Sequence, residues 1–242
     1  MTHFIIVANG QFQVREIIDE AIQDKIIIAL DGAADRLARL SILPHIIVGD
    51  FDSIDKKAWA ILETDEPHTG RDGVLIVPWK DQNLTDLTKA IRYCDAQQAA
   101  SITLVCATGN RSDHHEGTVR ALRAEYKKER PILLHTEQQT LRFAKDETAY
   151  LHGEIGDKCG IVALPAGSFS SQGLEYDVNN FVLEFGFAES TCNALRTQQA
   201  VVQVQGEALL IMPPMLRAQR YYMQKTEVER LQLQLRDAIA KY

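Results

Sequence analysis

The sequence has no apolar run near the roughly 18 residues that a helix needs to cross a bilayer, and no basic segment followed by an apolar one opens it. It has only four cysteines, Cys94, Cys106, Cys159 and Cys192, and none are spaced as Cys-x-x-Cys. Such scattered thiols do not predict a zinc site and are typical of buried side chains in a reducing compartment. We therefore expect a soluble, cytoplasmic protein with no membrane partner.

Positive charge is also scarce. The chain carries 26 Lys and Arg against 33 Asp and Glu, a formal net charge of -7. Binding to a nucleic-acid backbone requires a basic face, so nucleic acid is not an expected partner. With 242 residues, 45% of them hydrophobic, the chain is long enough for one large domain or two modest ones.

The acidic residues, in contrast, form four short clusters, and three of these sit where a predicted strand ends. The clusters are Asp31–Asp35, Gly49–Ser53, Asp81–Asp86 and Gly109–His114. Carboxylates gathered at one sheet edge repel each other unless a cation compensates their charge. Mg²⁺ is typically held by one or two carboxylates together with substrate phosphate oxygens. The clusters therefore predict a metal-dependent enzyme that acts on a nucleotide.

The first half alternates short apolar runs with segments of helical periodicity. Strands are predicted at 4–8, 26–30, 46–48, 74–77, 102–107 and 132–135, and helices at 12–24, 31–40, 84–98 and 115–128. This alternation indicates an α/β domain over residues 1–138, a mostly parallel, Rossmann-like sheet flanked by helices. Ligands of such sheets bind beyond the carboxyl ends of the strands, where Asp31, Asp50 and Asp113 fall.

From about residue 141 the helical pattern stops. Seven short strands are predicted, at 141–143, 148–152, 160–164, 173–178, 181–185, 200–205 and 208–212. Glycines punctuate them, and Gln205-Gly206-Glu207 suggests a tight hairpin. We interpret residues 139–214 as an antiparallel β-sandwich domain. Residues 215–242 are predicted to form a C-terminal helix that packs either on a partner or on its own domain.

The segment Gly49–Ser53 is the most informative cluster. Side chains two residues apart point the same way along an extended segment, so Asp50 and Asp52 could share one ion. The alternative is a solvated turn in which Ser53 caps the next helix. The metal site is favoured because the segment follows an Ile-Ile-Val strand and three similar clusters accompany it.

Thr85 and Asp86 open a predicted helix, and a helix N-terminus attracts phosphate. Thr85 could also merely cap this helix, and Asp86 could merely complement its dipole. Lys89 lies on the same face as Asp86, where it either contacts a phosphate or forms a solvated ion pair.

Arg111 suits a polyphosphate because its guanidinium donates bidentate hydrogen bonds. Asp113 could hold metal, accept a hydrogen bond from ribose or adenine, or cap the following helix. For His114 a contact with the nucleotide is favoured over metal ligation.

In this order, the clusters resemble those of the thiamine pyrophosphokinase (thiamin diphosphokinase) family. That family shows D-G-(G/A)-A, G-D-F-D-S, D-x-x-x-T-D-x-x-K-A and G-(G)-R-x-D-H, which stand here at 31–34, 49–53, 81–90 and 109–114. Residues 171–176 and 190–193 are similar to the family's S-x-G-L-x-W and S-T-S-N segments. Asn110, Tyr176 and Cys192 depart from the pattern, replacing a glycine, a tryptophan and a serine.

The resemblance implies an ATP:thiamine diphosphotransferase. Such an enzyme transfers the diphosphoryl group of ATP to the hydroxyethyl oxygen of thiamine, giving thiamine diphosphate and AMP. Residues 1–138 would then bind ATP and metal, 139–214 would bind thiamine, and 215–242 have no counterpart in the family. The resemblance also implies Mg²⁺ as cofactor and a homodimer with the substrate site at the subunit interface.

Three sets of site residues follow from the resemblance. The metal set is Asp31, Asp50, Asp52 and Asp86. The ATP set is Thr85, Lys89, Arg111, Asp113 and His114. The thiamine set is Gln82, Ser190 and Asn193. Asp50, Asp52 and Asp86 are the expected catalytic residues, and either Asp52 or Asp86 is the expected proton acceptor.

Three other functions stay open. The same nucleotide clusters would serve diphosphoryl transfer to another alcohol, such as a hydroxymethyl-pterin. A metal-dependent phosphohydrolase is disfavoured because Arg111 and the Thr85–Lys89 helix suit holding a nucleotide. A non-catalytic sensor of thiamine or nucleotide would have little need for so many carboxylates.

Overall fold

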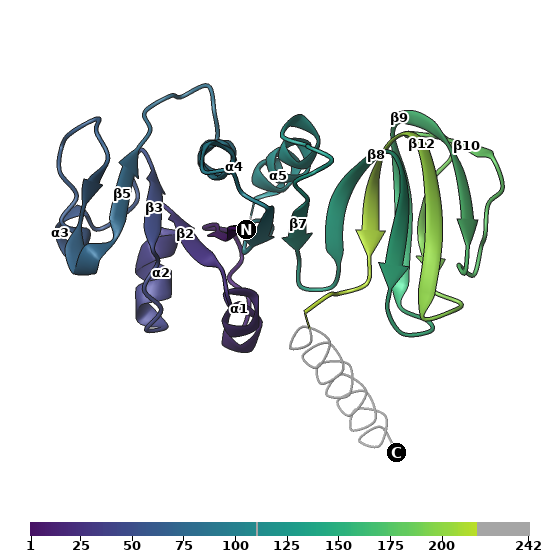
Figure 1. The fold of residues 1–242 in the computed structure, drawn as a ribbon, viewed down its shortest axis with the longest axis horizontal. Coiled ribbons are helices and arrows are strands. Elements are labelled where there is room, and N and C mark those ends of the chain that lie inside the picture. Colours follow the sequence, from purple (N-terminus) through teal and green to yellow (C-terminus); the bar gives the residue numbers. More distant parts are fainter. Residues whose placement is uncertain (110, 217–242) are drawn as a thin grey trace, which may run out of the picture.

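A computed structural model describes residues 1–109 and 111–216 of the chain (Figure 1). Asn110 and nearly all of the predicted C-terminal helix lie outside the described residues. The first half contains, in order, β1 (His3–Val7), α1 (Arg15–Ala21), β2 (Ile26–Leu30), α2 (Ala33–Arg39), β3 (Ile46–Gly49), α3 (Lys56–Trp59), β4 (His68–Thr69), the 3₁₀ helix η1 (Arg71–Gly73), β5 (Leu75–Pro78), α4 (Asp86–Ala96), β6 (Ser101–Val105), α5 (Ser112–Ala124) and β7 (Ile132–His135). The second contains β8 (Thr140–His152), β9 (Lys158–Gln172), β10 (Phe181–Glu184), β11 (Ser190–Ala194) and β12 (Gln199–Met212). None of the helices among these described residues is long and apolar enough to pass through a bilayer.

Six strands of the first half form the predicted parallel sheet, in the order β7-β6-β1-β2-β3-β5. The short β4 adds to β5 in the antiparallel sense. The chain runs outward from β1 through β2 and β3 to β5, then returns to the other side of β1 as β6. The order therefore switches between β1 and β6. In open α/β sheets, the crevice beyond the carboxyl ends of the strands at such a switch point receives ligands.

Helices cover both faces of this sheet, which explains why its strands are apolar throughout. On one face, Phe4 and Ile6 of β1 pack in a core with α4 and α5; on the other, Ile5 and Val7 pack with α1, α2 and α3. Alternate side chains of one strand thus serve two separate cores. Figure 1 shows α4 and α5 above the sheet and α1 and α2 below it.

The second half has five strands where seven were predicted. Two long strands each combine two predicted ones. β8 contains the predicted strands 141–143 and 148–152, and β12 contains the predicted strands 200–205 and 208–212. The predicted hairpin at Gly206 is wrong. This residue has φ +111° and lies at a register shift inside β12, where a β-bulge bends the strand without reversing it.

Two further differences concern the strands nearest the predicted thiamine residues. Residues 173–178 form a turn rather than a strand, and β11 (Ser190–Ala194) was not predicted. All five strands pair antiparallel and share a third apolar core. The predicted fold class, a helix-flanked α/β half followed by an antiparallel β half, is confirmed.

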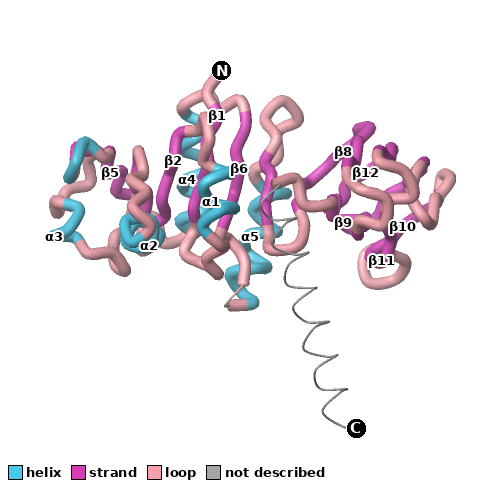
Figure 2. Tube along the Cα trace, turned by 90° about the horizontal axis from the view of Figure 1, so that it is seen from below, coloured by secondary structure: helices cyan, strands magenta, loops and turns pink. Residues whose placement is uncertain are grey.

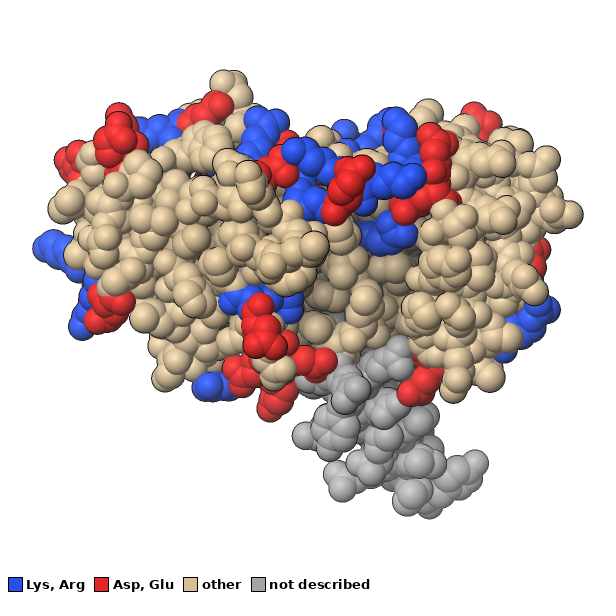
Figure 3. Space-filling view, in the orientation of Figure 1, with Lys and Arg blue, Asp and Glu red and all other residues tan. Residues whose placement is uncertain are grey.

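The two halves are joined by antiparallel pairing of β7 with β8, which continues the sheet in the order β10-β9-β12-β8-β7, and by contacts of α5 and the turn after it. Arg123 of α5 donates to Glu207 of β12 at 2.8 Å, and Glu207 also accepts from Lys145 of β8 at 2.8 Å. The ring of Tyr126 meets that of Phe143 edge-on, with centroids 5.0 Å apart. Figure 3 shows acidic and basic side chains intermixed along the upper edge of this face. The β half is thus joined to the α/β half through both charged and apolar contacts.

Candidate active site

Asp31 directly follows β2 and is only 5% exposed. Its Oδ2 accepts hydrogen bonds from the backbone N–H of Ser53, at 3.0 Å, and from the Ser53 hydroxyl. Its Oδ1 is buried and has no hydrogen-bond partner among the described residues. Burial raises the pKa of Asp31 to about 6; the hydrogen bonds from Ser53 oppose this rise and the neighbouring Asp52 adds to it. A buried carboxylate with an unpartnered oxygen is suited to receive a cation.

Asp50 and Asp52 lie in the loop after β3. The segment between them is not extended as predicted, because Phe51 has φ +64° and its ring is buried in the core. The left-handed turn nevertheless brings both carboxylates beside Asp31. Ligand oxygens from Asp31, Asp50 and Asp52 all lie within 4.8 Å of one another. This spacing matches what one divalent cation would bridge.

Gly32 allows the two loops of this carboxylate cluster to approach each other closely. A Cβ at this position would lie 3.0 Å from the Ser53 carbonyl oxygen and 2.8 Å from Asn9 Nδ2. Gly32 has an ordinary helical φ, so the requirement for glycine is steric rather than conformational. The D-G pair of the motif therefore places Asp31 against Ser53.

Ser53 is a site residue whose role the sequence did not reveal. The expected alternative, that it caps the next helix, is wrong, because Asp55 caps α3 by accepting from the backbone N–H groups of Lys57 and Ala58. Ser53 instead holds the carboxylate of Asp31. The signal was present in G-D-F-D-S, but a partner 22 residues away cannot be read from local sequence.

The start of α4 carries three of the predicted residues. Thr85 caps the helix, its Oγ1 accepting from the N–H of Thr88 at 3.2 Å. The side chain of Lys89 is 2% exposed, and its Nζ donates to Asp86 Oδ1 at 2.8 Å. Lys89 is therefore a buried ion-pair partner rather than a solvated one. Within the described chain, Asp86 is not part of the three-carboxylate group.

Arg111, Asp113 and His114 stand at the start of α5. Arg111 donates two hydrogen bonds to Asp113, at 2.6 and 3.1 Å, and their side chains are 65% and 64% exposed. These hydrogen bonds lower the pKa of Asp113 to about 2, and the backbone N–H of His114 contributes to this. His114 is also exposed. The Arg111 guanidinium is open to solvent. It would contact a phosphate by giving up its hydrogen bonds to Asp113.

The side-chain amide of Asn193 on β11 is fully occupied. Its Oδ1 accepts from the N–H groups of Tyr176 and Ala194, at 3.1 and 2.9 Å, and its Nδ2 donates to the Tyr176 carbonyl and Ser190 Oγ, at 2.9 and 3.2 Å. Asn193 is 2% exposed, whereas Tyr176 is 64% exposed. Asn193 therefore fixes the turn that presents the Tyr176 ring to solvent.

One chain does not bring the predicted thiamine residues together. Gln82 lies beside the carboxylates, donating to Asp50 Oδ2 at 3.2 Å. Ser190 and Asn193 lie on β11, whose partner β9 is seven strand intervals from β3 in the sheet order. At about 4.8 Å per interval this is on the order of 30 Å along the sheet. Figure 2 shows β11 at the end of the molecule that the β half forms, away from β2, and both views place β10 at that end.

Comparison with known proteins identifies the family. Residues 19–134 match the family model described as "Thiamin pyrophosphokinase, catalytic domain", and residues 138–211 match "Thiamin pyrophosphokinase, vitamin B1 binding domain". The chain belongs to the thiamin pyrophosphokinase family. The resemblance seen in the motifs is thereby confirmed over most of both halves.

Individual members of the thiamin pyrophosphokinase family agree. Thiamin pyrophosphokinase 1 of Caenorhabditis elegans is 30% identical over 190 residues, which are 73% of this chain and 74% of the worm protein. Thiamine pyrophosphokinase 2 of Arabidopsis thaliana is 28% identical over 183 residues, 69% of this chain and 64% of the plant protein. The Bacillus subtilis thiamine pyrophosphokinase structure shares the fold, with a TM-score of 0.74 at 21% identity, covering 89% of this chain and all of the bacterial one.

Proposed function

We propose that this protein is a thiamine pyrophosphokinase, which transfers the diphosphoryl group of ATP to the hydroxyethyl oxygen of thiamine and releases AMP. One observation carries the proposal above others. The family's catalytic and vitamin B1 binding models follow each other along the chain, and three motif carboxylates of the first converge at the carboxyl edge of its sheet. The family likeness favours thiamine over another alcohol as the acceptor.

Mg²⁺ is the proposed cofactor. Asp31, Asp50 and Asp52 offer hard oxygen ligands at the right mutual spacing, and Asp31 Oδ1 lacks a partner among the described residues. The residues present therefore fit a divalent cation. Such an ion, when bound, would offset the phosphate charge around the β-phosphorus of ATP. Asp86, at the start of α4, completes the proposed metal set.

The catalytic roles are proposed for Asp50, Asp52 and Asp86. The thiamine hydroxyl has to lose a proton as its oxygen attacks, and a carboxylate within hydrogen-bond reach can accept it. Asp31 is unsuited to this step because it is buried and held by Ser53. Asp52 and Asp86 are more accessible and share the role in this proposal.

The polyphosphate is proposed to lie between the starts of α4 and α5. Both N-termini present free backbone N–H groups, which favour anions. Both helices pack on the same face of the sheet, so their N-termini flank one region of its edge. The residues proposed to hold ATP there are Thr85, Lys89, Arg111, Asp113 and His114.

A homodimer is also part of the proposal. Gln82 lies beside the carboxylates and Ser190 and Asn193 lie far along the sheet, so one site that uses all three needs a second copy. The β half carries exposed apolar side chains suited to such contact: Phe181, Val182, Phe185 and Phe187, which are 51 to 88% exposed. The thiamine site would then combine the α/β half of one protomer with the β half of its partner.

The cellular location proposed is the cytoplasm. All four cysteines are free, and Cys94, Cys106 and Cys159 are buried. Unpaired thiols of this kind are usual in a reducing compartment.

The test is incubation with thiamine, ATP and Mg²⁺, followed by mass analysis. We expect thiamine diphosphate and AMP in equal amounts and no ADP. ADP with thiamine monophosphate, or AMP formed at the same rate without thiamine, would refute the proposal. Replacing thiamine with a hydroxymethyl-pterin tests the rival acceptor, and binding of both substrates without products would indicate a sensor.

A further inference from the structure

The side chain of Asp35 joins its helix to the segment that follows β3. Asp35 lies in the first turn of α2, where an acidic residue often does no more than complement the positive end of the helix. Here its Oδ1 accepts a hydrogen bond from the indole Nε1–H of Trp59 at 2.8 Å, and its Oδ2 accepts from the backbone N–H of Asp55 at 3.2 Å. Both oxygens of this carboxylate are therefore used outside α2.

The segment held in this way, residues 50–55, carries two of the three clustered carboxylates, Asp50 and Asp52. The side chains of Phe51 and Ile54 are buried in the core, which anchors the segment on its apolar side. The two carboxylates are not part of that core, so polar contacts have to fix their positions.

Two such contacts reach the segment from the start of α2 and the loop before it. In one, Ser53 donates to Asp31; in the other, Asp55 donates to Asp35. Asp31 belongs to the three-carboxylate group, so a cation that takes its lone pairs would compete with the hydrogen bonds from Ser53. Among the described residues, Asp35 is outside that group. Its hydrogen bonds can therefore hold the segment in the same place before and after a metal binds.

A surface cavity lies against this joint. It has a volume of about 640 Å³, and Asp35, Asp55, Ala58 and Trp59 are among the residues that line it. Atoms that border open space lose the packing contacts that hold close-packed side chains in place. Hydrogen bonds rather than packing thus fix the joint on this side, and without them the segment would be free to shift.

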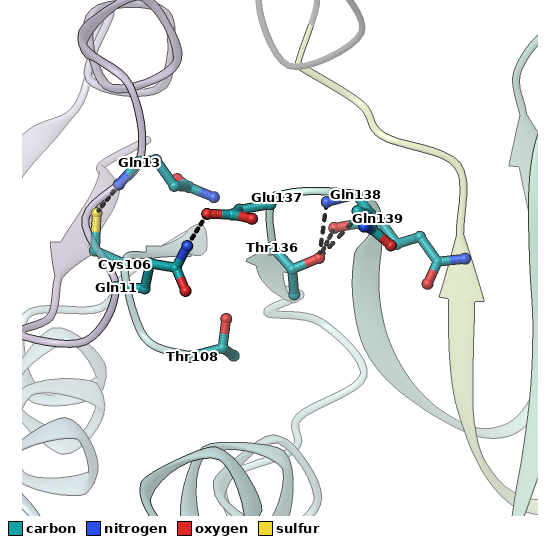
Figure 4. A pocket seen from close by; sticks show the side chains of 8 residues that line it. All are labelled: Gln11, Gln13, Cys106, Thr108, Thr136, Glu137, Gln138 and Gln139. Atoms are coloured by element: carbon teal, nitrogen blue, oxygen red, sulfur yellow. Dashed lines mark hydrogen bonds between the residues drawn. The ribbon is translucent and has the colours of Figure 1, made fainter. Parts of the chain in front are cut away.

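α2 itself is fixed to a second loop, the one after β1. The guanidinium of Arg36 donates to the Gly10 carbonyl oxygen at 2.8 Å and lies over the ring of Phe12, 4.1 Å from its centroid. The same loop lines a pocket of about 210 Å³, in which Figure 4 shows Gln11 meeting Glu137 of the β7–β8 turn. Because these contacts do not involve Asp35, its loss would release the segment after β3 and leave the helix in place.

We propose that Asp35 is a positioning residue for the metal site, an inference that rests on the proposed function and its Mg²⁺. Asp35 keeps Asp50 and Asp52 at the spacing that one cation bridges, although it is not itself a metal ligand. Asp35→Ala should weaken Mg²⁺ binding about tenfold, since a loosened segment no longer holds the three carboxylates in one arrangement.

Calorimetric titration of the metal-free protein with Mg²⁺ tests this role. Asp35→Asn keeps one acceptor oxygen and should bind Mg²⁺ about threefold more weakly than the wild type. Trp59→Phe removes one donor without changing the charge and should also cost about threefold. Because Asp35 and Trp59 act as a pair, adding Trp59→Phe to Asp35→Ala should cause no further loss. A further loss of the same size would show that Trp59 acts through packing alone and would contradict the pairing.

Asp55→Asn is the matched control for charge. It removes one negative charge from the same segment, but asparagine is also a good N-cap for α3, and the backbone N–H that binds Asp35 is retained. Its Mg²⁺ affinity should stay within about twofold of the wild type. A loss as large as that of Asp35→Ala would mean that charge, and not position, sets the affinity, and would overturn the proposal.

Hydrogen exchange of the Ser53 backbone N–H, followed by NMR without metal, reports the position of the segment directly. Asp35→Ala should speed this exchange about tenfold, because the released segment opens more often, and Asp55→Asn should leave it unchanged. Wild-type exchange and wild-type Mg²⁺ affinity in Asp35→Ala would overturn the positioning role, as would a wild type that binds no Mg²⁺.

The product assay separates this proposal from the proposed function. Thiamine diphosphate formation by the wild type, with unchanged Mg²⁺ affinity in Asp35→Ala, would refute only the positioning role. Mg²⁺ binding that depends on Asp35, without any products, would refute only the proposed reaction.

Discussion

Asp31 combines burial, an unpartnered oxygen and two neighbouring carboxylates, each of which disfavours its charged form when no metal is bound. The Ser53 hydrogen bonds reduce this cost but do not cancel it, since the pKa of Asp31 remains raised, to about 6. Without a metal, the buried negative charge of Asp31 lowers the free energy of unfolding, and a bound cation would offset this cost. The same arrangement predicts opposite effects of one substitution on stability and on metal binding.

Asp31→Asn should stabilise the metal-free protein at pH 7.5. Because the folded pKa of about 6 exceeds the ordinary 3.8, Asp31 favours the folded state at low pH, and this contribution is lost as pH rises from about 4 to above 6. The gain in the free energy of unfolding should be up to about 3 kcal/mol at pH 7.5 and should shrink toward pH 4. Urea denaturation at both pH values measures it.

The same denaturation series with Mg²⁺ provides the control. Mg²⁺ should stabilise the wild type and leave Asp31→Asn nearly unchanged, because a ligand stabilises only the state that binds it. A variant that is less stable than the wild type at pH 7.5 without metal would show that the Asp31 charge does not destabilise the folded protein.

Ser190→Ala should raise the KM for thiamine about three- to tenfold, the value of one hydrogen bond, and leave the KM for ATP within about twofold. Asn193→Ala should act similarly but also lower the free energy of unfolding by about 1 to 3 kcal/mol. The reason is that the backbone N–H and carbonyl of Tyr176 would lose their hydrogen bonds to the Asn193 side chain. Steady-state kinetics with each substrate varied in turn measures both. Equal effects on the two KM values would count against a thiamine site in the β half.

At the scale of elements, the sequence predicts the parallel half well and the antiparallel half less well. Strands such as β1 and β2 are buried on both faces, so each is an uninterrupted apolar run between loops. β8 and β12 are long strands that carry charged or polar residues and a bulge midway, so local patterns divide each in two. β11 reads Ser-Thr-Cys-Asn-Ala and has no apolar alternation to reveal it.

The candidate site, like the fold, could be predicted from the sequence only in part. The G-D-F-D-S motif predicts a carboxylate cluster, and the cluster exists, but the left-handed Phe51 and the Ser53 hydrogen bond that build it are not visible in the spacing. The pocket lined by Gln11, Gln13, Cys106, Thr108 and residues 136–139 has no local sequence signal, because its walls come from three separate segments of the chain. Contacts between segments far apart in the chain cannot be predicted from local sequence patterns. The domain boundaries at 138 and 214 stay predictions.

Gly32→Ala should disrupt the joint between the loops after β2 and β3. The added methyl group would meet the Ser53 carbonyl oxygen and Asn9 Nδ2, so Asp31 has to move away from Asp50 and Asp52. We expect a loss of about 1 to 3 kcal/mol in stability and at least about tenfold weaker Mg²⁺ binding. Calorimetric Mg²⁺ titration and denaturation measure the two effects.

Gly117→Ala is the matched control for this substitution. Gly117 lies in α5 with open space around the position of its Cβ, so alanine should stabilise the protein by about 0.5 to 1 kcal/mol through helix propensity. Mg²⁺ affinity should not change. Equal Mg²⁺ affinities for Gly32→Ala and Gly117→Ala would contradict the claim that a side chain at position 32 displaces Asp31.

At the scale of the whole molecule, the proposed site needs two chains. The carboxylate cluster follows β2 and β3 of the α/β half, whereas β11 lies in the β half of the same protomer (Figure 2). In a two-fold symmetric dimer, each site would take its metal residues from one chain and its thiamine residues from the other.

Mixed dimers of two inactive variants should therefore regain activity. Asp52→Asn disables the metal residues and Ser190→Phe blocks the proposed thiamine position. After unfolding and refolding together, half of the dimers carry one chain of each kind and one intact site, so about a quarter of wild-type activity is expected. No recovery, with mixed dimers shown by mass spectrometry, would place each site within one chain.

The most direct measurement of the central claim is phosphorus NMR of ATP, thiamine and Mg²⁺ with the wild type and with the Asp50→Asn, Asp52→Asn double variant. The wild type should produce AMP and thiamine diphosphate without ADP. The double variant should keep its circular dichroism spectrum and turn over at least about 1,000-fold more slowly, because it lacks the ligands that position the charge-compensating ion. Near-normal AMP formation by the folded double variant would contradict a metal-dependent transfer at this edge of the sheet.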